Sequence, residues 1–279
     1  MPVIFNEDEV PKEHISEGVS VQRLITPESV KSDYLYTERL HLEPNAVSDF
    51  SVDSDSLVWF HVISGSLLLY GEFGEKELSG DYFVLLPPSL EARVSTTEGA
   101  LLFKATVPQA YRFDQNWRTS EMGIRFVDWT KEPVLNSEYD ERRRIYMLTP
   151  QLSGTKVAKG EMIIYPPGTK AANHHHEGAE HFQVILTGNA TFYVDNVPHS
   201  VRAGDTIYIY DNEQHYFIND GKEELSFIEY FVPGVYKTVW AEGANICTWS
   251  PSGLNIKGGM PSREVKAHSS AEAHTIKEL

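Results

Sequence analysis

Histidine is unusually dense in one stretch of the chain. Four of the eleven histidines fall within residues 174–181. Imidazole is the commonest protein ligand for borderline divalent metal ions, and the rings of a His-x-His pair in an extended strand point to one side, because strand side chains alternate. His174 and His176 have this spacing. The sequence therefore predicts a metal site built around this pair.

Two more histidines can join the pair from other strands. His181 opens the next apolar segment in phase with Gln183, and His215 opens a later segment in phase with Phe217. With four such ligands, an octahedral ion would keep two open positions. The predicted metal ligands are His174, His176, His181 and His215.

Two further polar residues lie where they could act on a substrate at this site. Glu229 interrupts the apolar run 225–232 and shares a strand face with Phe227 and Phe231. A carboxyl group that faces an apolar interior must be paired, hydrogen-bonded or protonated, as in a general base. The alternative is that this face of the strand is exposed to solvent. We expect Glu229 and Gln183, which could hydrogen-bond the substrate, to be the catalytic residues.

The segments that carry these residues are short and rich in Val, Ile, Phe and Tyr. Gly, Pro, Asn or Asp separates them at intervals of about 8–12 residues, a pattern typical of antiparallel sandwiches and barrels. The sequence therefore predicts an all-β fold. Around the histidines we expect strands near 143–148, 161–165, 181–187, 190–195, 206–210, 214–219 and 224–232, with turns at 195–196 and 219–221.

The chain also contains an internal repeat. Residues 60–65 resemble residues 183–188 at an offset of 123, and residues 103–108 resemble 227–233 at an offset of about 125. We interpret the repeat as two copies of one unit in tandem.

The spacing of the histidines resembles the motifs of the cupin family. The first motif, G-x5-H-x-H-x3–4-E-x6-G, is matched by Gly168, His174, His176 and Gly188. The second, G-x5-P-x-G-x2-H-x3-N, is matched by Gly204, His215 and Asn219, with Tyr210 in place of proline and Asn212 in place of glycine. With its two copies the chain resembles a bicupin, which implies two tandem antiparallel jelly-roll barrels.

One departure from the family motif concerns the third ligand. His181 occupies the glutamate position of the motif, and Glu180 is one residue out of step. Adjacent strand residues face opposite sides, so only one of the two can reach the metal. Strand phase favours His181, with Glu180 as the alternative. Four neutral imidazoles would leave the 2+ charge uncancelled, which favours Lewis-acid chemistry and an anionic substrate.

The first copy lacks the ligand set. The residues at its equivalent positions are Ser51, Asp53, Val58 and Glu91. The resemblance thus implies a degenerate first barrel with a structural role. We expect the following organisation: an acidic arm at 1–18, the degenerate barrel at 19–110, a linker at 111–141, the metal-binding barrel at 142–234 and a tail at 235–279.

Composition limits the partners of the protein. The 279 residues include 24 Lys and Arg against 40 Asp and Glu, a net charge of −16, which disfavours nucleic acid and membrane surfaces. One cysteine, an acidic start and no apolar run of membrane-spanning length predict a cytoplasmic protein without intramolecular disulfides. A monomer and a homodimer are both compatible with the sequence.

Three functions follow from the resemblance. The first is a metal-dependent oxygenase or dioxygenase in which Fe(II), or else Mn, Ni or Zn, chelates a small oxygen-rich substrate. The second is a non-redox isomerase, lyase or hydrolase acting on a sugar-derived or carboxylate substrate, with Glu229 moving a proton. The third is a bicupin that binds metal or ligand without turnover. Among these we expect an enzyme, and the oxygenase first.

Overall fold

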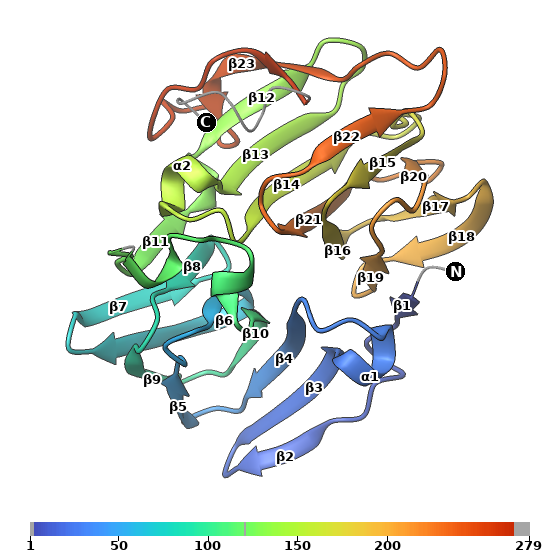
Figure 1. Cartoon of the computed structure of the whole chain (residues 1–279). Helices are drawn as coiled ribbons and strands as arrows, with labels where there is room; N and C mark the ends of the chain where they lie inside the picture. Colours follow the sequence, from blue (N-terminus) through green and yellow to red (C-terminus); the bar gives the residue numbers. More distant parts are fainter. Residues whose placement is uncertain (1–2, 120, 271–279) are drawn as a thin grey trace. The chain divides into compact units, whose positions relative to one another are not determined.

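A computed structural model describes residues 3–119 and 121–270 of the chain (Figure 1). The chain forms two compact units, one of residues 7–129 and the other of residues 130–270 together with residues 3–6. Antiparallel strands dominate both units, which confirms the predicted all-β fold. None of the helices in the described segments is long and apolar enough to cross a bilayer.

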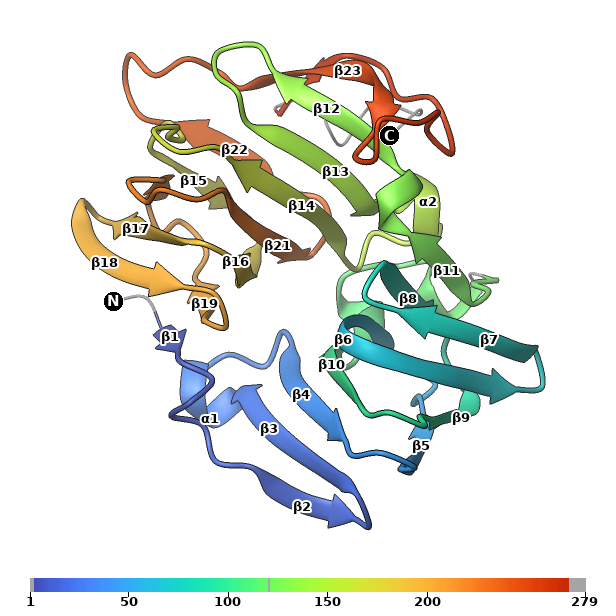
Figure 2. The ribbon, with the colours of Figure 1, turned by 180° about the vertical axis from the view of Figure 1, so that it is seen from behind.

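The unit that carries the histidine cluster consists of two sheets and one short helix, α2 (Pro150–Ser153). The larger sheet has nine strands in the order β1 (Val3–Phe5), β19 (Thr206–Ile209), β16 (Glu180–Thr187), β21 (Leu225–Val232), β14 (Lys159–Tyr165), β13 (Arg143–Leu148), β12 (Pro133–Ser137), β23 (Thr248–Asn255) and β24 (His268–Ser269). The smaller has five, in the order β18 (Val197–Arg202), β17 (Asn189–Val194), β20 (His215–Ile218), β15 (His174–Glu177) and β22 (Lys237–Trp240). Figure 2 shows β1 beside β19 at one edge of the larger sheet.

The other unit is a sheet of ten strands. Its main path runs β11 (Arg125–Asp128), β8 (Tyr82–Leu86), β6 (Leu57–Gly71), β10 (Ala100–Val107), β4 (Tyr36–Leu42), β3 (Val19–Ile25) and β2 (Glu13–Ser16). Off this path, β7 (Gly74–Ser79) pairs with β6, and β9 (Glu91–Ser95) pairs with both β6 and β5 (Val47–Ser51). The short helices are α1 (Pro27–Val30), η1 (Ala110–Arg112) and η2 (Trp117–Thr119), and η3 (Trp129–Lys131) lies where the two units meet in the sequence.

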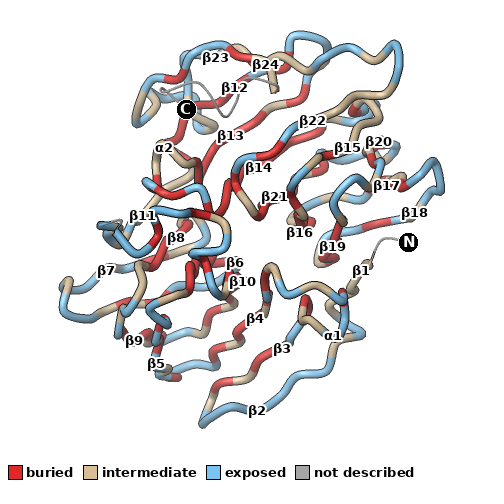
Figure 3. The backbone as a smooth tube through the Cα atoms, viewed as in Figure 1, coloured by how far each residue is buried: buried red, intermediate tan, exposed pale blue. Residues whose placement is uncertain are grey.

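Aromatic side chains from both sheets fill the interior of the histidine-bearing unit. The ring of Phe217 lies 4.7 Å from that of Phe192 and 4.9 Å from that of Phe227, between ring centroids, and all three are buried. The central strands β14 and β16 are buried along most of their length, as Figure 3 shows. This packed end of the barrel anchors the strands whose other positions carry the histidines.

All seven strands predicted around the histidines are present, and each predicted end lies within two residues of the observed end. The predicted turn at Asp195 and Asn196 joins β17 to β18, and both residues have positive φ, 48° and 63°. Such values are typical of the two-residue hairpin turn, and Asn and Asp adopt them more readily than other residues that carry a side chain. The sequence did not predict β18 itself.

Segments outside the two predicted barrels also form strands. Within the predicted linker, β11 pairs with β8 and β12 pairs with β13, so the two ends of the linker join different units. The predicted tail supplies β22, β23 and β24, and the predicted arm supplies β1 and β2. Three of these strands, β2, β11 and β22, have only four residues each and no buried residue, so they lack the alternation of apolar residues that identifies a strand in sequence. Residues 1–2 and 271–279 of the predicted arm and tail lie outside the described part.

Candidate metal centre

The structure brings the four predicted histidines together. His174 and His215 face each other across the β15–β20 pair, and their ring centroids lie 4.5 Å apart. His176, two residues along β15, lies 4.9 Å from His181 of β16 and 5.3 Å from His215. The His181 and His215 rings are 4.8 Å apart. Three strands from two sheets thus direct four imidazoles to one point.

Hydrogen bonds orient three of these rings. Nδ1 of His174 donates to the carbonyl of Ala172 at 2.8 Å, and Nδ1 of His215 donates to the carbonyl of Glu213 at 2.9 Å. Nδ1 of His176 lies 3.1 Å from Oγ1 of Thr238. Metal-binding histidines characteristically use one ring nitrogen in this way and present the other to the ion. The three rings therefore present Nε2 to the centre of the cluster.

Several nitrogens of the cluster are buried without a hydrogen-bond partner among the described residues. These are both ring nitrogens of His181 and Nε2 of His215. Since a buried polar atom without a partner costs about 1–3 kcal/mol, such atoms call for a ligand. Burial, the largest cause, lowers the pKa of all four histidines, that of His174 to about 4, so the rings stay in the neutral form that binds metal.

The neighbouring polar residues point elsewhere. Glu180 accepts a hydrogen bond from the hydroxyl of Tyr208, on the face of β16 opposite His181. The side chain of His175 lies 3.7 Å from the carboxylate of Glu177 on the outer side of β15. Strand alternation thus separates these residues from the cluster, as the sequence predicted for His181 against Glu180.

Glu229 and Gln183 lie directly beside the cluster. Both are buried, and Nε2 of Gln183 donates to Oε1 of Glu229 at 2.6 Å. The same oxygen lies 3.6 Å from Nε2 of His181. Burial, and secondly the charge of Glu161, raises the pKa of Glu229 to about 8. The alternative of a solvent-exposed face at Glu229 does not hold.

A second buried carboxyl group, Glu161, faces Glu229 across the β14–β21 pair. It lies 3.2 Å from the guanidinium of Arg144 and 3.3 Å from the ammonium of Lys159. Burial alone would raise the pKa of Glu161, but these two cations outweigh it and lower the pKa. One carboxylate is therefore held ionised next to one that keeps its proton.

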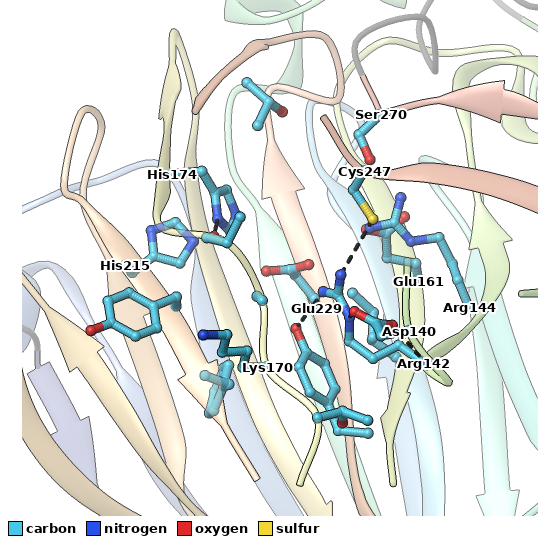
Figure 4. A pocket seen from close by; sticks show the side chains of 18 of the residues that line it. Asp140, Arg142, Arg144, Glu161, Lys170, His174, His215, Glu229, Cys247 and Ser270 are labelled. Carbon is cyan, nitrogen blue, oxygen red and sulfur yellow. Dashed lines mark hydrogen bonds and ion pairs between the residues drawn. The ribbon is translucent and has the colours of Figure 1, made fainter. Parts of the chain in front are cut away.

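Three of the four histidines, His174, His176 and His215, line one cavity of about 560 Å³ together with Glu229. In Figure 4, His174 and His215 lie on one side of it and Arg142 and Arg144 on the other, with Glu229 between. We did not predict the two arginines in the site, because a run of three arginines beside acidic residues is typical of a solvated face. Both are buried, whereas Arg143 between them forms a surface ion pair with Glu224. The sequence of the run does not separate Arg142 and Arg144 from Arg143, because the strand that follows is buried on both faces.

The first copy keeps the strand pairings without the histidines. Ser51 faces Glu91 across the β5–β9 pair, as His174 faces His215 in the second copy, and the Ser51 hydroxyl donates to Glu91 at 2.7 Å. Val58, at the position of His181, is buried. Asp53, at the position of His176, is exposed. The four positions thus offer two carboxylates and no imidazole, so the first copy lacks a closed ligand set.

Comparison with known proteins gives the same family. The Cupin domain family matches residues 161–231. Protein MJ1618 of Methanocaldococcus jannaschii is 34% identical over 105 residues, 34% of this chain and 83% of that protein. The oxalate-binding protein of Thermotoga maritima is 26% identical over 109 residues, 38% of this chain and 90% of that protein. The dimethylsulfoniopropionate lyase DddW of Ruegeria pomeroyi is 29% identical over 92 residues, 32% of this chain and 59% of that protein.

Solved structures extend the likeness to both copies. A single-substitution variant of Bacillus subtilis oxalate decarboxylase superimposes with a TM-score of 0.68 at 16% identity, over 85% of this chain and 79% of that chain. The chain therefore belongs to the cupin family and is a bicupin. It spans between 59% and 90% of the length of its curated relatives, and less than two thirds of two of them.

Proposed function

We propose that this bicupin is a metal-dependent enzyme that moves a proton on a small organic acid, in a lyase, isomerase or hydrolase reaction that needs no oxygen. The observation that carries the proposal is Glu229, a buried carboxyl group hydrogen-bonded to Gln183 and adjacent to the histidine cluster. A site that only stores a ligand has no need of a buried acid, whose desolvation costs free energy.

The residues fit a divalent ion, because the cluster offers neutral imidazoles with buried, unpartnered nitrogens. His174, His176, His181 and His215 would hold the ion. When bound, it would polarise a substrate oxygen with a 2+ charge that neutral ligands leave uncancelled. Imidazole suits iron, manganese, nickel and zinc, and the oxalate decarboxylase of Bacillus subtilis has Mn(II) centres.

The side chains around Glu229 prepare it for proton transfer. The amide of Gln183 holds Oε1, which leaves Oε2 to carry the proton. The ionised Glu161, held by Arg144 and Lys159, disfavours a second negative charge next to it. Two carboxyl groups whose surroundings push their pKa values apart are the mark of an acid and its electrostatic partner. In this proposal Glu229 is the group that gives or takes the proton.

The oxygenase remains the second candidate. In its favour, an octahedral ion held by four histidines would keep two open positions, which suits the binding of both a substrate and oxygen. The relatives include a lyase and an oxalate-binding protein, which supports an acidic substrate for either chemistry. Because one of them is named only for binding, a bicupin that binds a ligand without turnover is the third candidate.

Hydrogen exchange in D₂O tests the proposal. Metal-loaded protein is incubated under argon with a panel of small carboxylic acids, and proton NMR follows the loss of C–H signals and the appearance of products. We expect exchange or conversion of at least one acid without oxygen, and a loss of about 10²–10⁴-fold in Glu229→Gln with its metal retained. Glu224→Gln, an exposed acid, is the matched control. Turnover that requires and consumes oxygen would instead establish the oxygenase.

A further inference from the structure

Arg142 occupies the side of the cavity opposite the histidines. Its side chain is buried and lines the cavity, and Figure 4 places it beyond Glu229 as seen from His174 and His215. A guanidinium stays charged at all physiological pH values, so it carries a fixed positive charge into an enclosed space. Such a charge is costly unless something pairs with it.

The protein satisfies this guanidinium only in part. Nε donates to Oδ2 of Asp140 at 2.7 Å, Nη1 to the hydroxyl of Tyr165 at 3.2 Å, and Nη2 to Sγ of Cys247 at 3.4 Å. A guanidinium has five N–H donors, and a thiol sulfur is a weak acceptor. Two donors therefore have no acceptor among the described residues, and a third has a poor one. An acceptor with two oxygens in one plane would complete the set.

The neighbouring arginines are engaged elsewhere. Arg144 is bound through its Nη groups to Glu161 and to the hydroxyl of Tyr146, while its buried Nε has no acceptor among the described residues. Arg143 is bound to Glu224 on the surface. The Nη groups of Arg142 contact only a hydroxyl and a thiol, whereas one Nη of Arg144 is held by Glu161. Arg142 can therefore bind a carboxylate through its Nη groups while its Nε keeps Asp140.

The cavity is large enough to separate the two ends of a substrate. Its volume of about 560 Å³ lies in the range of pockets that enclose molecules much larger than a two-carbon acid. Aromatic residues, among them Tyr165, Phe227 and Trp249, line the space along with the charged groups. A substrate with an apolar middle and a polar group at each end matches this lining.

We propose that Arg142 binds a carboxylate at the end of the substrate away from the histidines, and that the substrate class is therefore an organic acid with two acidic ends. The inference rests on the proposed function for the placement of the reacting end at the histidine cluster. Arg142 then determines specificity, because it strengthens the binding of substrates that have a second carboxylate without contacting the reacting atoms.

Calorimetric titration of the metal-loaded protein tests this assignment. The probes are straight-chain dicarboxylates from succinate to suberate, each compared with the monocarboxylate of the same length. We expect at least one dicarboxylate to bind about tenfold or more tightly than its monocarboxylate, since hydrogen bonds between a guanidinium and a carboxylate are among the stronger ones. Arg142→Gln should abolish this preference and leave monocarboxylate binding within about twofold. Arg143→Gln, the surface neighbour, should keep it.

Two results would overturn the assignment: a wild-type protein without preference at any chain length, or a preference that survives in Arg142→Gln. Arg142→Lys keeps the charge without the planar fork and should retain part of the preference, which guards against loss through misfolding. His176→Ala separates this inference from the proposed function. If His176→Ala, without bound metal, binds the monocarboxylates as tightly as the wild type, the metal part of the proposed function fails. A dicarboxylate preference that persists in this variant supports the assignment of Arg142 alone.

Discussion

His181 and Glu180 are adjacent on β16 and therefore face opposite sides of its sheet. His181 is fully buried in the cluster, whereas Glu180 bonds to the hydroxyl of Tyr208. Which of these two residues faces inward determines whether the ligand set includes a carboxylate and so carries a negative charge. In our proposal the set is neutral, which leaves the ion its full charge toward an anionic substrate.

Alanine substitution at each position tests this register. We expect His181→Ala to weaken metal binding by about tenfold or more, because it removes one of four ligands, and Glu180→Ala to leave the affinity nearly unchanged. Competition with a coloured chelator measures both constants. A loss of metal in Glu180→Ala with retention in His181→Ala would reverse the assignment.

Some residues of the site could be predicted from the sequence and others could not. The histidines and Glu229 stand out in sequence, because polar residues in apolar strands are rare. Arg142 and Arg144 do not stand out, because a run of charged residues is typical of an exposed face. Arg142 pairs with Asp140 two residues earlier, and Arg144 with Glu161 of the neighbouring strand β14. Only the folded sheet shows which arginines face inward.

At the scale of elements, strand β22 connects the tail to the metal centre. It pairs with β15 over four residues, and its Thr238 lies 3.1 Å from Nδ1 of His176. The tail thus supplies both a strand of the smaller sheet and a contact that orients the imidazole of His176. The strand is too short and too exposed for its sequence to show this role.

Replacing Thr238 by Val tests the orienting contact. The substitution keeps the shape of the side chain and removes the oxygen, so we expect metal affinity to fall by about 10–100-fold without loss of folding. Lys237→Ala, which alters an exposed ion pair on the same strand, serves as the control. Chelator competition gives the affinities. If the metal affinity of Thr238→Val equals that of the wild type, Thr238 has no role in orienting His176.

Gly188, in the turn between β16 and β17, has a strict steric requirement. Its φ is 76°, and a Cβ there would lie 2.6 Å from the carbonyl oxygen of Glu224. Gly154, at the end of α2, has the same φ and open space around it. The pair separates the cost of the backbone conformation from the cost of the clash.

Urea unfolding of two alanine variants measures these costs. Gly154→Ala should lower the free energy of unfolding by about 1–2 kcal/mol, the cost of a left-handed alanine. Gly188→Ala should lower it further, because the backbone must also shift. Equal values for the two variants would show that the clash at Gly188 is relieved without cost.

At the scale of the whole molecule, the repeat was readable because both copies keep the same pairings. Glu161 faces Glu229 in the second copy, and at the equivalent positions of the first copy Glu38 faces Lys104. There the two side chains form an ion pair at 2.6 Å. In place of two carboxyl groups the first copy has an ion pair whose charges cancel, and it also lacks the histidines. Both differences support the prediction that only the second copy forms a metal site.

Elemental analysis of protein purified without a polyhistidine tag tests the central claim, that the second copy holds one divalent ion on its four histidines. Wild-type protein, His176→Ala and His175→Ala are compared by metal content per chain. We predict about one ion in the wild type and in His175→Ala, whose ring faces outward, and none in His176→Ala. Equal metal content in His176→Ala and the wild type, or no uptake by the wild type on titration, would contradict the account.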